Sequence, residues 1–254
     1  MSLLQALDVS FGVSKRLLCE GLTLHIEAGE CWGILGPNGS GKTTLLHTLA
    51  GLHPLQAGRI TLGGKPLEQL DRRAIARQLG LLLQDSHDPF PATVWETVLS
   101  GRHPHLARWQ NEGESEWAIA REALATMQLC GMEQRQVQTL SGGERRRLAV
   151  ATLLTQAPPL MLLDEPLNHL DLRHQQLLLA AVRQCCADGH GVIMVLHDPN
   201  QALHYCDRVL LLEGNGRWQQ GSSRELLTAE RLSALYNCRI EGVELAGRRW
   251  LHYL

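Results

Sequence analysis

The chain has 254 residues, of which 44% are apolar and 20% charged, with 24 lysines and arginines against 26 aspartates and glutamates. This composition is typical of a globular protein and excludes a disordered or fibrous chain. The net charge of −2 gives no general attraction for polyanions, so we expect no nucleic-acid partner. No apolar run reaches the roughly 18 residues of a membrane-spanning helix, and no signal-peptide core opens the chain. We therefore expect a chain that is neither secreted nor membrane-spanning.

The cysteines indicate a reducing compartment. There are 7, an odd number, they are scattered along the chain, and no two of them have the C-x-x-C spacing. This pattern favours free thiols over a disulfide framework. A zinc site is the alternative, and the missing ligand spacing argues against it.

The first third of the chain predicts strands followed by a loop and a helix. Short apolar runs occupy residues 7–11, 22–26 and 31–35, and a glycine-rich turn then leads into the apolar residues 43–49. Buried strands bounded by turn residues have this appearance.

The remainder predicts a helical middle and a return to strands. Trp117, Ala120, Leu124 and Met127 recur at helical spacing, and residues 148–154 form a second apolar segment after another glycine turn. Apolar runs at residues 160–163 and 192–196 then flank a helix-like segment at 174–186. Alternating strands and helices predict a parallel sheet. We expect the tail, residues 222–254, to form a helix and a strand that close the core, with a dimer contact as the alternative.

A phosphate-binding loop is the strongest local signal. Residues 36–43 fit G-x-x-x-x-G-K-[ST] between a predicted strand and a predicted helix. Glycines let consecutive backbone N–H groups face phosphate oxygens, and the helix N-terminus adds its positive end. Lys42 would supply charge at the β and γ phosphates, and the Thr43 hydroxyl would ligate Mg²⁺.

Two carboxylates follow the strand predicted at residues 160–163. We expect Asp164 to hold Mg²⁺ and Glu165 to orient or deprotonate the attacking water, because adjacent strand residues point in opposite directions and cannot share one task. A solvated strand end is the alternative. About 120 residues separate Lys42 from Asp164, far more than one crossover needs, so a further unit is inserted between them. Within that interval, residues 140–144 (LSGGE) form a second glycine turn that enters a helix.

Taken in order, these segments resemble the nucleotide-binding subunit of ATP-binding cassette (ABC) transporters over nearly the whole chain. LSGGE resembles the ABC signature, and residues 168–171 (NHLD) resemble the D-loop that ends in Asp171. Gln84 stands at the Q-loop glutamine, His197 at the switch histidine, and Phe11 at the aromatic residue that stacks on adenine, commonly tyrosine. For Gln84 and His197 the alternative is an ordinary polar strand end, and for Phe11 it is a core aromatic.

The resemblance implies an α/β P-loop NTPase fold with a RecA-like parallel-sheet core, an N-terminal antiparallel β subdomain and an inserted α-helical signature subdomain. It implies one ABC ATPase domain over residues 1–254, with the catalytic core and β subdomain at 1–84 and 158–254 and the helical subdomain at 85–157.

The resemblance also implies ATP and Mg²⁺ as cofactors and a complete set of site residues. The catalytic residues are Glu165, His197, Gln84 and Lys42. The nucleotide-binding residues are Phe11, Gly36, Pro37, Asn38, Gly39, Ser40, Gly41, Lys42, Thr43 and Thr44. The signature that meets ATP from a second copy is Leu140, Ser141, Gly142, Gly143 and Glu144. The Mg²⁺ ligands are Thr43, Gln84 and Asp164.

A finer resemblance concerns residues 92–98 (ATVWETV) and 101–105 (GRHPH), which are similar to ATPases of iron-siderophore, haem and cobalamin importers. It implies a peripheral subunit at the cytoplasmic face of the inner membrane, paired head to tail with a second copy. It also implies separate permease subunits and, indirectly, a periplasmic or extracellular binding protein. The alternative function is a soluble non-transport ABC ATPase of repair, translation or cluster assembly. A P-loop kinase or GTPase would leave LSGGE and His197 unexplained.

Some residues depart from the family or invite other interpretations. Glu144 replaces the commoner glutamine, Leu167 the usual threonine or serine, and Thr152 a frequent arginine. His103 and His105 lack a nearby carboxylate or thiolate partner in the sequence, which disfavours a metal site. We expect the arginines at 145–147 to form a solvated or interdomain face and not an anion site.

Overall fold

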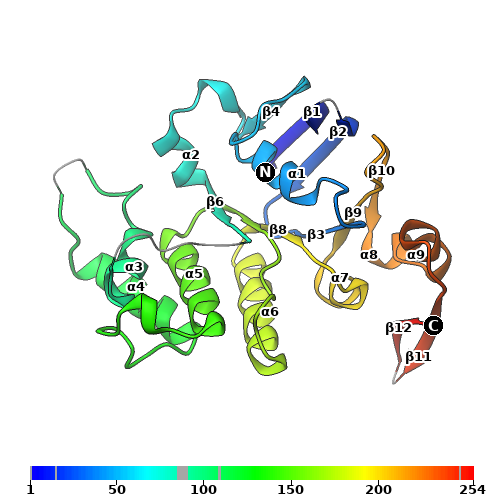
Figure 1. Ribbon diagram of the computed structural model, residues 1–254. Helices are drawn as coiled ribbons and strands as arrows, with labels where there is room; N and C mark the ends of the chain where they lie inside the picture. Colours follow the sequence, from blue (N-terminus) through cyan, green and yellow to red (C-terminus); the bar gives the residue numbers. More distant parts are fainter. Residues whose placement is uncertain (1, 15, 85–90, 108–109, 246) are drawn as a thin grey trace.

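The structure is a computed structural model that describes residues 2–14, 16–84, 91–107, 110–245 and 247–254. It contains two principal sheets with helices on both sides of the larger one. Figure 1 shows the smaller sheet and α1 on one side of the larger sheet, with α6 and α7 on the other.

The smaller sheet is antiparallel and has the order β2-β1-β4-β5. Its strands are β1 (Ser2–Val13), β2 (Arg16–Glu27), β4 (Ala57–Leu62) and β5 (Lys65–Pro66). Their inward residues alternate with outward ones, as a sheet with one buried face requires. The predicted N-terminal antiparallel subdomain is confirmed.

The larger sheet has six strands in the order β10-β9-β3-β8-β7-β6. They are β3 (Cys31–Leu35), β6 (Leu79–Leu82), β7 (Leu160–Leu163), β8 (Gly191–Val195), β9 (Arg208–Leu212) and β10 (Trp218–Ser222). All neighbours are parallel except β10, which runs antiparallel to β9. The parallel core predicted from the alternation of strands and helices is therefore confirmed.

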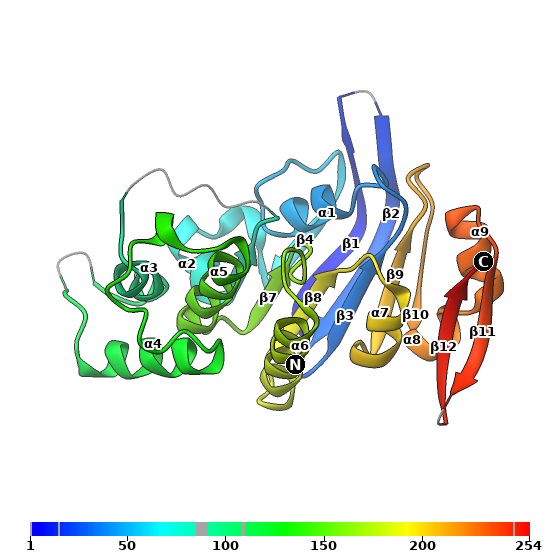
Figure 2. The ribbon, with the colours of Figure 1, turned by 60° about the horizontal axis from the view of Figure 1, so that its bottom comes forward.

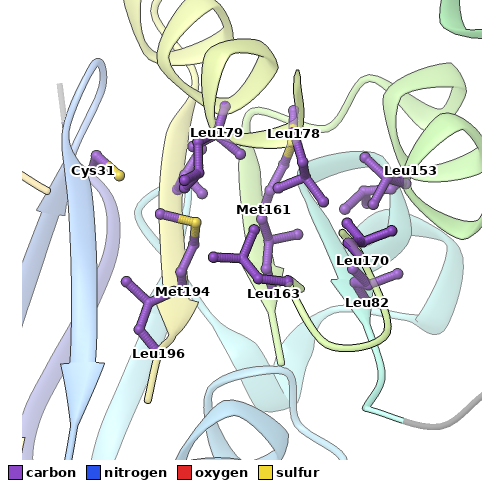
Figure 3. Packing of buried hydrophobic residues seen from close by; sticks show 14 of the residues in the cluster. Cys31, Leu82, Leu153, Met161, Leu163, Leu170, Leu178, Leu179, Met194 and Leu196 are labelled. Carbon is purple, nitrogen blue, oxygen red and sulfur yellow. The ribbon is translucent and has the colours of Figure 1, made fainter. Parts of the chain in front are cut away.

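The core lies on both faces of this sheet because its strands are buried on both sides. On β7 and β8, Leu162 and Ile193 pack toward the antiparallel sheet and α1, whereas Met161 and Met194 pack toward the helices of the other face. Figure 3 shows this second layer, in which Met161, Leu163 and Met194 lie against Leu178 and Leu179 of α6. Continuous apolar runs are what a doubly covered parallel strand needs.

The helices begin at recognisable caps. Thr93, Ser141 and Asp171 each accept a hydrogen bond from a backbone N–H in the first turn of the helix that follows. The helices are α1 (Lys42–Leu49), α2 (Arg72–Gln78), α3 (Val94–Ser100), α4 (Glu114–Thr126), α5 (Gly142–Gln156), α6 (Leu172–Ala187), α7 (Pro199–Tyr205), α8 (Ser223–Leu226) and α9 (Ala229–Tyr236), with 3₁₀ turns at Leu67–Gln69 and Val137–Thr139.

The middle of the chain forms a helical unit at one end of the molecule, where α3, α4 and α5 pack together (Figure 2). Ala120, Leu124 and Met127 are buried there and Trp117 packs against them, as their spacing predicted. Strands β6 and β7 are neighbours in the sheet, so the chain leaves its edge, builds these helices and returns beside the strand it left. The insertion is confirmed, and its exact bounds stay a prediction.

The tail forms α8, α9 and a separate hairpin of β11 (Ile240–Leu245) and β12 (Arg248–Tyr253). Leu227, Leu232 and Leu251 are buried, so the tail closes the core as expected. Among the described residues, no helix combines the length and apolarity needed to cross a membrane.

Candidate active site

The loop between β3 and α1 needs its glycines. Gly36, Gly39 and Gly41 have φ values of 154°, 75° and 101°, in the region that side chains disfavour. A Cβ at Gly36 would also lie 2.3 Å from the Leu212 carbonyl oxygen. The loop therefore turns tightly over the end of the sheet, as a phosphate-binding backbone must.

Lys42 is folded over this loop. Its Nζ donates hydrogen bonds to the Gly36 and Pro37 carbonyl oxygens, at 2.8 and 3.1 Å. Burial lowers the pKa of the Lys42 ammonium, and the carboxylates of Glu165 and Asp164 oppose that shift. Burial disfavours the charged ammonium, so a phosphate anion bound at the loop would stabilise it.

Asp164, directly after β7, is fully buried, and neither carboxylate oxygen has a hydrogen-bond partner among the described residues. Burial raises the pKa of this carboxyl, and the neighbouring Thr43 hydroxyl opposes the rise. A buried, unsatisfied carboxylate is costly unless a ligand completes it. With the Thr43 hydroxyl beside it, Asp164 fits a hard divalent cation that takes oxygen ligands.

Other metal sites lack support. The described residues contain no group of three or more His, Cys, Asp and Glu side chains placed to hold a metal ion. His105 Nε2 instead lies 2.8 Å from the Gln156 carbonyl oxygen, and His103 lies 3.8 Å from Glu112. Mg²⁺ at Asp164 would draw its remaining ligands from phosphate and water, as this ion usually does.

The Glu165 carboxylate contacts three other polar side chains of the site. Its Oε1 lies 2.7 Å from His197 Nε2, and its Oε2 accepts hydrogen bonds from Gln84 Nε2 at 3.0 Å and Asn168 Nδ2 at 2.5 Å. The residue itself adopts a left-handed backbone conformation, with φ 48°. The ends of β6, β7 and β8 thus bring together Gln84, Glu165 and His197, three residues far apart in sequence. Asn168 opens the NHLD segment, in which only Asp171 was predicted as a site residue.

A cavity of about 170 Å³ borders this cluster, lined in part by Glu165, Asn168, His197 and Asp198. It is large enough for several water molecules, and its walls carry polar groups that can bind them. Water can therefore reach the carboxylate that is expected to activate it.

Arg146 corrects the expectation of a solvated arginine face. Its guanidinium is buried, with 6% of the residue exposed, and it donates to the carbonyl oxygens of Leu83, Gln84, Asp164, Glu165 and Pro166.

Arg147 is buried as well and donates to the Met127 and Gln128 carbonyls. The solvated interpretation was wrong for both residues, because backbone oxygens replace water around them. The interdomain interpretation holds, since Arg146 joins α5 to the ends of β6 and β7.

Phe11 requires a second correction. It is fully buried in β1, and a Cβ built on Gly41 would lie 3.3 Å from its ring. A ring packed beneath the loop has no free face for a base, so the prediction that Phe11 stacks on adenine is wrong and the core alternative holds.

The LSGGE segment starts α5 with a capping box. Ser141 Oγ accepts from the Glu144 backbone N–H at 3.2 Å, and Glu144 Oε2 accepts from the Ser141 N–H at 2.8 Å. These bonds hold the pKa of the Glu144 carboxyl below its usual range. Among the described residues, no hydrogen bond or ion pair joins residues 140–144 to residues 36–44. Asp171 caps α6 by accepting from the His174 backbone N–H, and its Oδ1 also lies 2.9 Å from His174 Nδ1. Both contacts lower the pKa of the Asp171 carboxyl.

Comparisons with known proteins agree with this geometry. The sequence matches the ABC transporter family over residues 19–168. It is 35% identical to the hemin import ATP-binding protein HmuV of Rhizobium meliloti, over 94% of this chain and 92% of that protein. It is 36% identical to the ferric enterobactin transport ATP-binding protein FepC of Escherichia coli, over 91% of this chain and 86% of that protein.

Solved structures agree as well. The inward-facing structure of an ABC transporter described as metal-chelate type superposes with a TM-score of 0.86 and 26% identity, covering 100% of this chain and 97% of that one. The phosphate loop, the LSGGE helix and the Glu165 cluster lie on a fold that these proteins share. The chain belongs to the ABC transporter family.

Proposed function

We propose that this chain hydrolyses ATP to drive the import of a metal chelate, as the ATP-binding subunit of an importer. The observation that carries the hydrolytic part is the Glu165 cluster: one carboxylate beside the phosphate loop, held by Gln84, Asn168 and His197 and bordered by a water-sized cavity. Relatives named for hemin import, petrobactin import and ferric enterobactin transport support the transport part.

The phosphate loop would bind the triphosphate through its backbone N–H groups and Lys42. In this proposal residues 36–44 contact the phosphates, and Lys42 exchanges its two carbonyl partners for phosphate oxygens. Thr43, Asp164 and Gln84 would hold Mg²⁺, which would supply positive charge to offset that of the phosphates. Phe11 is left out of the set, because it is buried.

Glu165 would act as general base. A base must lie within hydrogen-bond reach of the water that it deprotonates. In the structure Oε1 lies against His197 and Oε2 accepts from Gln84 and Asn168, and an ionised carboxylate has about four acceptor sites, so one on Oε1 remains for the water. His197, beside the same oxygen, would contact the γ-phosphate and help to position that water.

The second half of the ATP site would come from another copy. Ser141 and Gly142 are exposed at the start of α5, and residues 140–144 have no bond to the phosphate loop among the described residues, so one chain would offer two half-sites. A head-to-tail pair would bring Ser141 and the glycines of one chain to the nucleotide of the other, with Asp171 beside that junction. Such a dimer would close on ATP and open after hydrolysis.

The partners follow from the same proposal. The chain would dock on separate permease subunits at the cytoplasmic face of the cell membrane. A periplasmic or extracellular binding protein would deliver the cargo to those permease subunits. The cargo would be an iron-siderophore, haem or cobalamin. The alternative, a soluble non-transport ABC ATPase, gains no support from these relatives, which are named for hemin import and ferric enterobactin transport.

Uptake by intact cells tests this proposal. Cells that lack the chain would be given labelled ferric siderophore, haem or cobalamin, with wild type or Glu165→Gln restored. We expect one cargo to be lost and only wild type to rescue it. Normal entry of all three cargoes would contradict the transport proposal and favour the soluble alternative.

A further inference from the structure

The C-terminal hairpin is tied to the helix that follows His197. Leu251 is the buried residue of β12, and both of its backbone groups bond the side chain of Asn200. The Asn200 Nδ2 donates to the Leu251 carbonyl oxygen at 3.0 Å, and the Asn200 Oδ1 accepts from the Leu251 N–H at 2.8 Å. The carboxamide thus pairs with β12 as a neighbouring strand would.

The same side chain is joined to the residue that starts α7. Asp198 Oδ1 caps the helix by accepting from the Asn200 backbone N–H at 2.8 Å, and it also accepts from Asn200 Nδ2 at 3.1 Å. Asp198 directly follows His197. A continuous set of hydrogen bonds therefore runs from the backbone of β12, through Asn200 and Asp198, to the residue next to the histidine that bonds Glu165.

A second contact lies one turn further along α7. The ring of His204 packs against Trp250 of β12, with centroids 4.6 Å apart. Residues 200 and 204 lie on one face of a helix because they are four positions apart. β12 therefore holds α7 near both of its ends and fixes its rotation.

We propose that Asn200 is a positioning residue, through which the C-terminal hairpin sets where His197 stands relative to Glu165. The inference rests on the proposed function, since it concerns the same histidine. His197 has a half-exposed side chain, so packing alone does not fix it. Its backbone lies between the end of β8 and the start of α7. The β8 side is anchored by the bond from the Leu196 N–H to the Ile34 carbonyl at 3.1 Å. A change in the seating of α7 is therefore passed directly to His197.

The chain provides a matched control on the other strand of the hairpin. Ser233 of α9 bonds both backbone groups of Ile240 in β11, accepting from its N–H at 2.9 Å and donating to its carbonyl at 3.4 Å. Ser233→Ala loosens the hairpin by the same kind of contact, at a place that does not touch α7. Comparing the two variants distinguishes the effect of a less stable hairpin from the effect of a displaced α7.

The test measures steady-state MgATP hydrolysis by the full chain. For Asn200→Ala we expect kcat to fall about tenfold, since small displacements of a reacting group cost one to two orders of magnitude, while KM for ATP stays within about twofold. We expect Ser233→Ala to keep both constants. A kcat for Asn200→Ala within twofold of wild type would overturn the inference.

A spectroscopic measurement adds a readout that a merely structural role would not move. The ring ¹⁵N signals of His197, assigned by their absence in His197→Gln, report its bond to Glu165. They should shift in Asn200→Ala and stay in place in Ser233→Ala. An equal loss of kcat in both variants with unmoved His197 signals would also overturn the inference. Should Asn200→Ala not fold, Asn200→Asp, which keeps the acceptor for the Leu251 N–H but loses the donor, carries the same test.

Glu165→Gln, measured in parallel, separates this inference from the proposed function. Wild-type turnover by Glu165→Gln would overturn the proposed role of Glu165 itself. Loss of turnover there, combined with normal kcat in Asn200→Ala, would remove the positioning role alone.

Discussion

Arg146 Nη2 donates a hydrogen bond to the backbone carbonyl oxygen of Glu165 at 2.8 Å. Arg146 lies on α5, one turn after the LSGGE cap, and Glu165 lies just beyond β7 in the catalytic core. The helix that begins at Ser141 is thus bonded to the backbone that carries the proposed base. A displacement of α5 would be transmitted through this bond to the Glu165 backbone.

Replacing Arg146 tests how much this link stabilises the fold. Arg146→Ala would remove five hydrogen bonds, including the buried ones to the Asp164 and Pro166 carbonyl oxygens, and we expect the free energy of unfolding to fall by about 3 kcal/mol. Urea denaturation measures the loss. Arg145→Ala, on the same helix, removes a bond to the Gln138 carbonyl only and should cost about 1 kcal/mol or less. Equal losses in the two variants would contradict the special role of Arg146.

Replacing Glu165 tests the base. Glu165→Gln keeps the size of the side chain but cannot take a proton, so we expect turnover to fall at least about a hundredfold, or ~3 kcal/mol in barrier, with ATP binding retained. Phosphate release and nucleotide titration measure the two properties. Glu213→Gln is the control, because Glu213 also directly follows a buried strand, β9, but stands apart from His197. Near-normal turnover by Glu165→Gln would remove Glu165 as the base.

The raised pKa of Asp164 predicts a pH-dependent effect on stability. Because burial raises the folded-state pKa above 3.8, the charged carboxylate destabilises the nucleotide-free fold at pH above that raised pKa. Asp164→Asn should therefore increase the free energy of unfolding at pH 7, and the gain should shrink as pH falls toward 3.8, where wild type is protonated too.

Denaturation curves at several pH values check this expectation, in buffer without nucleotide or Mg²⁺. Asp188→Asn, at an exposed helix end, should show no comparable change. The same Asp164→Asn protein should bind MgATP more weakly, since a neutral amide is a poorer ligand for Mg²⁺. A loss of stability at pH 7, in place of a gain, would contradict the burial argument.

The proposed head-to-tail dimer predicts that a substitution in the signature segment can abolish ATP-driven dimerisation without abolishing ATP binding. Ser141→Arg places a bulky cation where the second copy would meet the nucleotide, so we expect ATP binding by the monomer to persist and ATP-driven dimerisation to be lost. Light scattering with and without ATP measures association. Ser141→Thr keeps the hydroxyl that caps α5 and should still dimerise. An ATP-dependent dimer of Ser141→Arg would refute the proposed pairing.

Much of the fold could be predicted because its signals are local. The glycines of the phosphate loop are needed by the backbone itself, and the apolar runs at β3, β7 and β8 reflect strands buried on both faces. The spacing around Leu124 reflects one buried face of a helix. Each of these features depends on a few neighbouring residues.

The contacts that the sequence did not reveal depend on residues far apart in the chain. Arg146 looks like part of a charged run until the ends of β6 and β7 surround it with carbonyl oxygens. The burial of Phe11 depends on how β1 packs beneath Gly41. The bonds between Asn200 and Leu251 join α7 to a strand about 50 residues later, and no local pattern marks them.

The position of β3 between β8 and β9 has a consequence for synthesis of the chain. Cys31 pairs with Val192 and Trp32 with Arg208, so the strand that leads into the phosphate loop gains its neighbours only about 160 residues later. Until the ribosome has made β8, the apolar residues of β3 have no neighbouring strand in this sheet. In a nascent chain the apolar residues of this strand must therefore be shielded until β8 follows, and only then does the sheet support the phosphate loop.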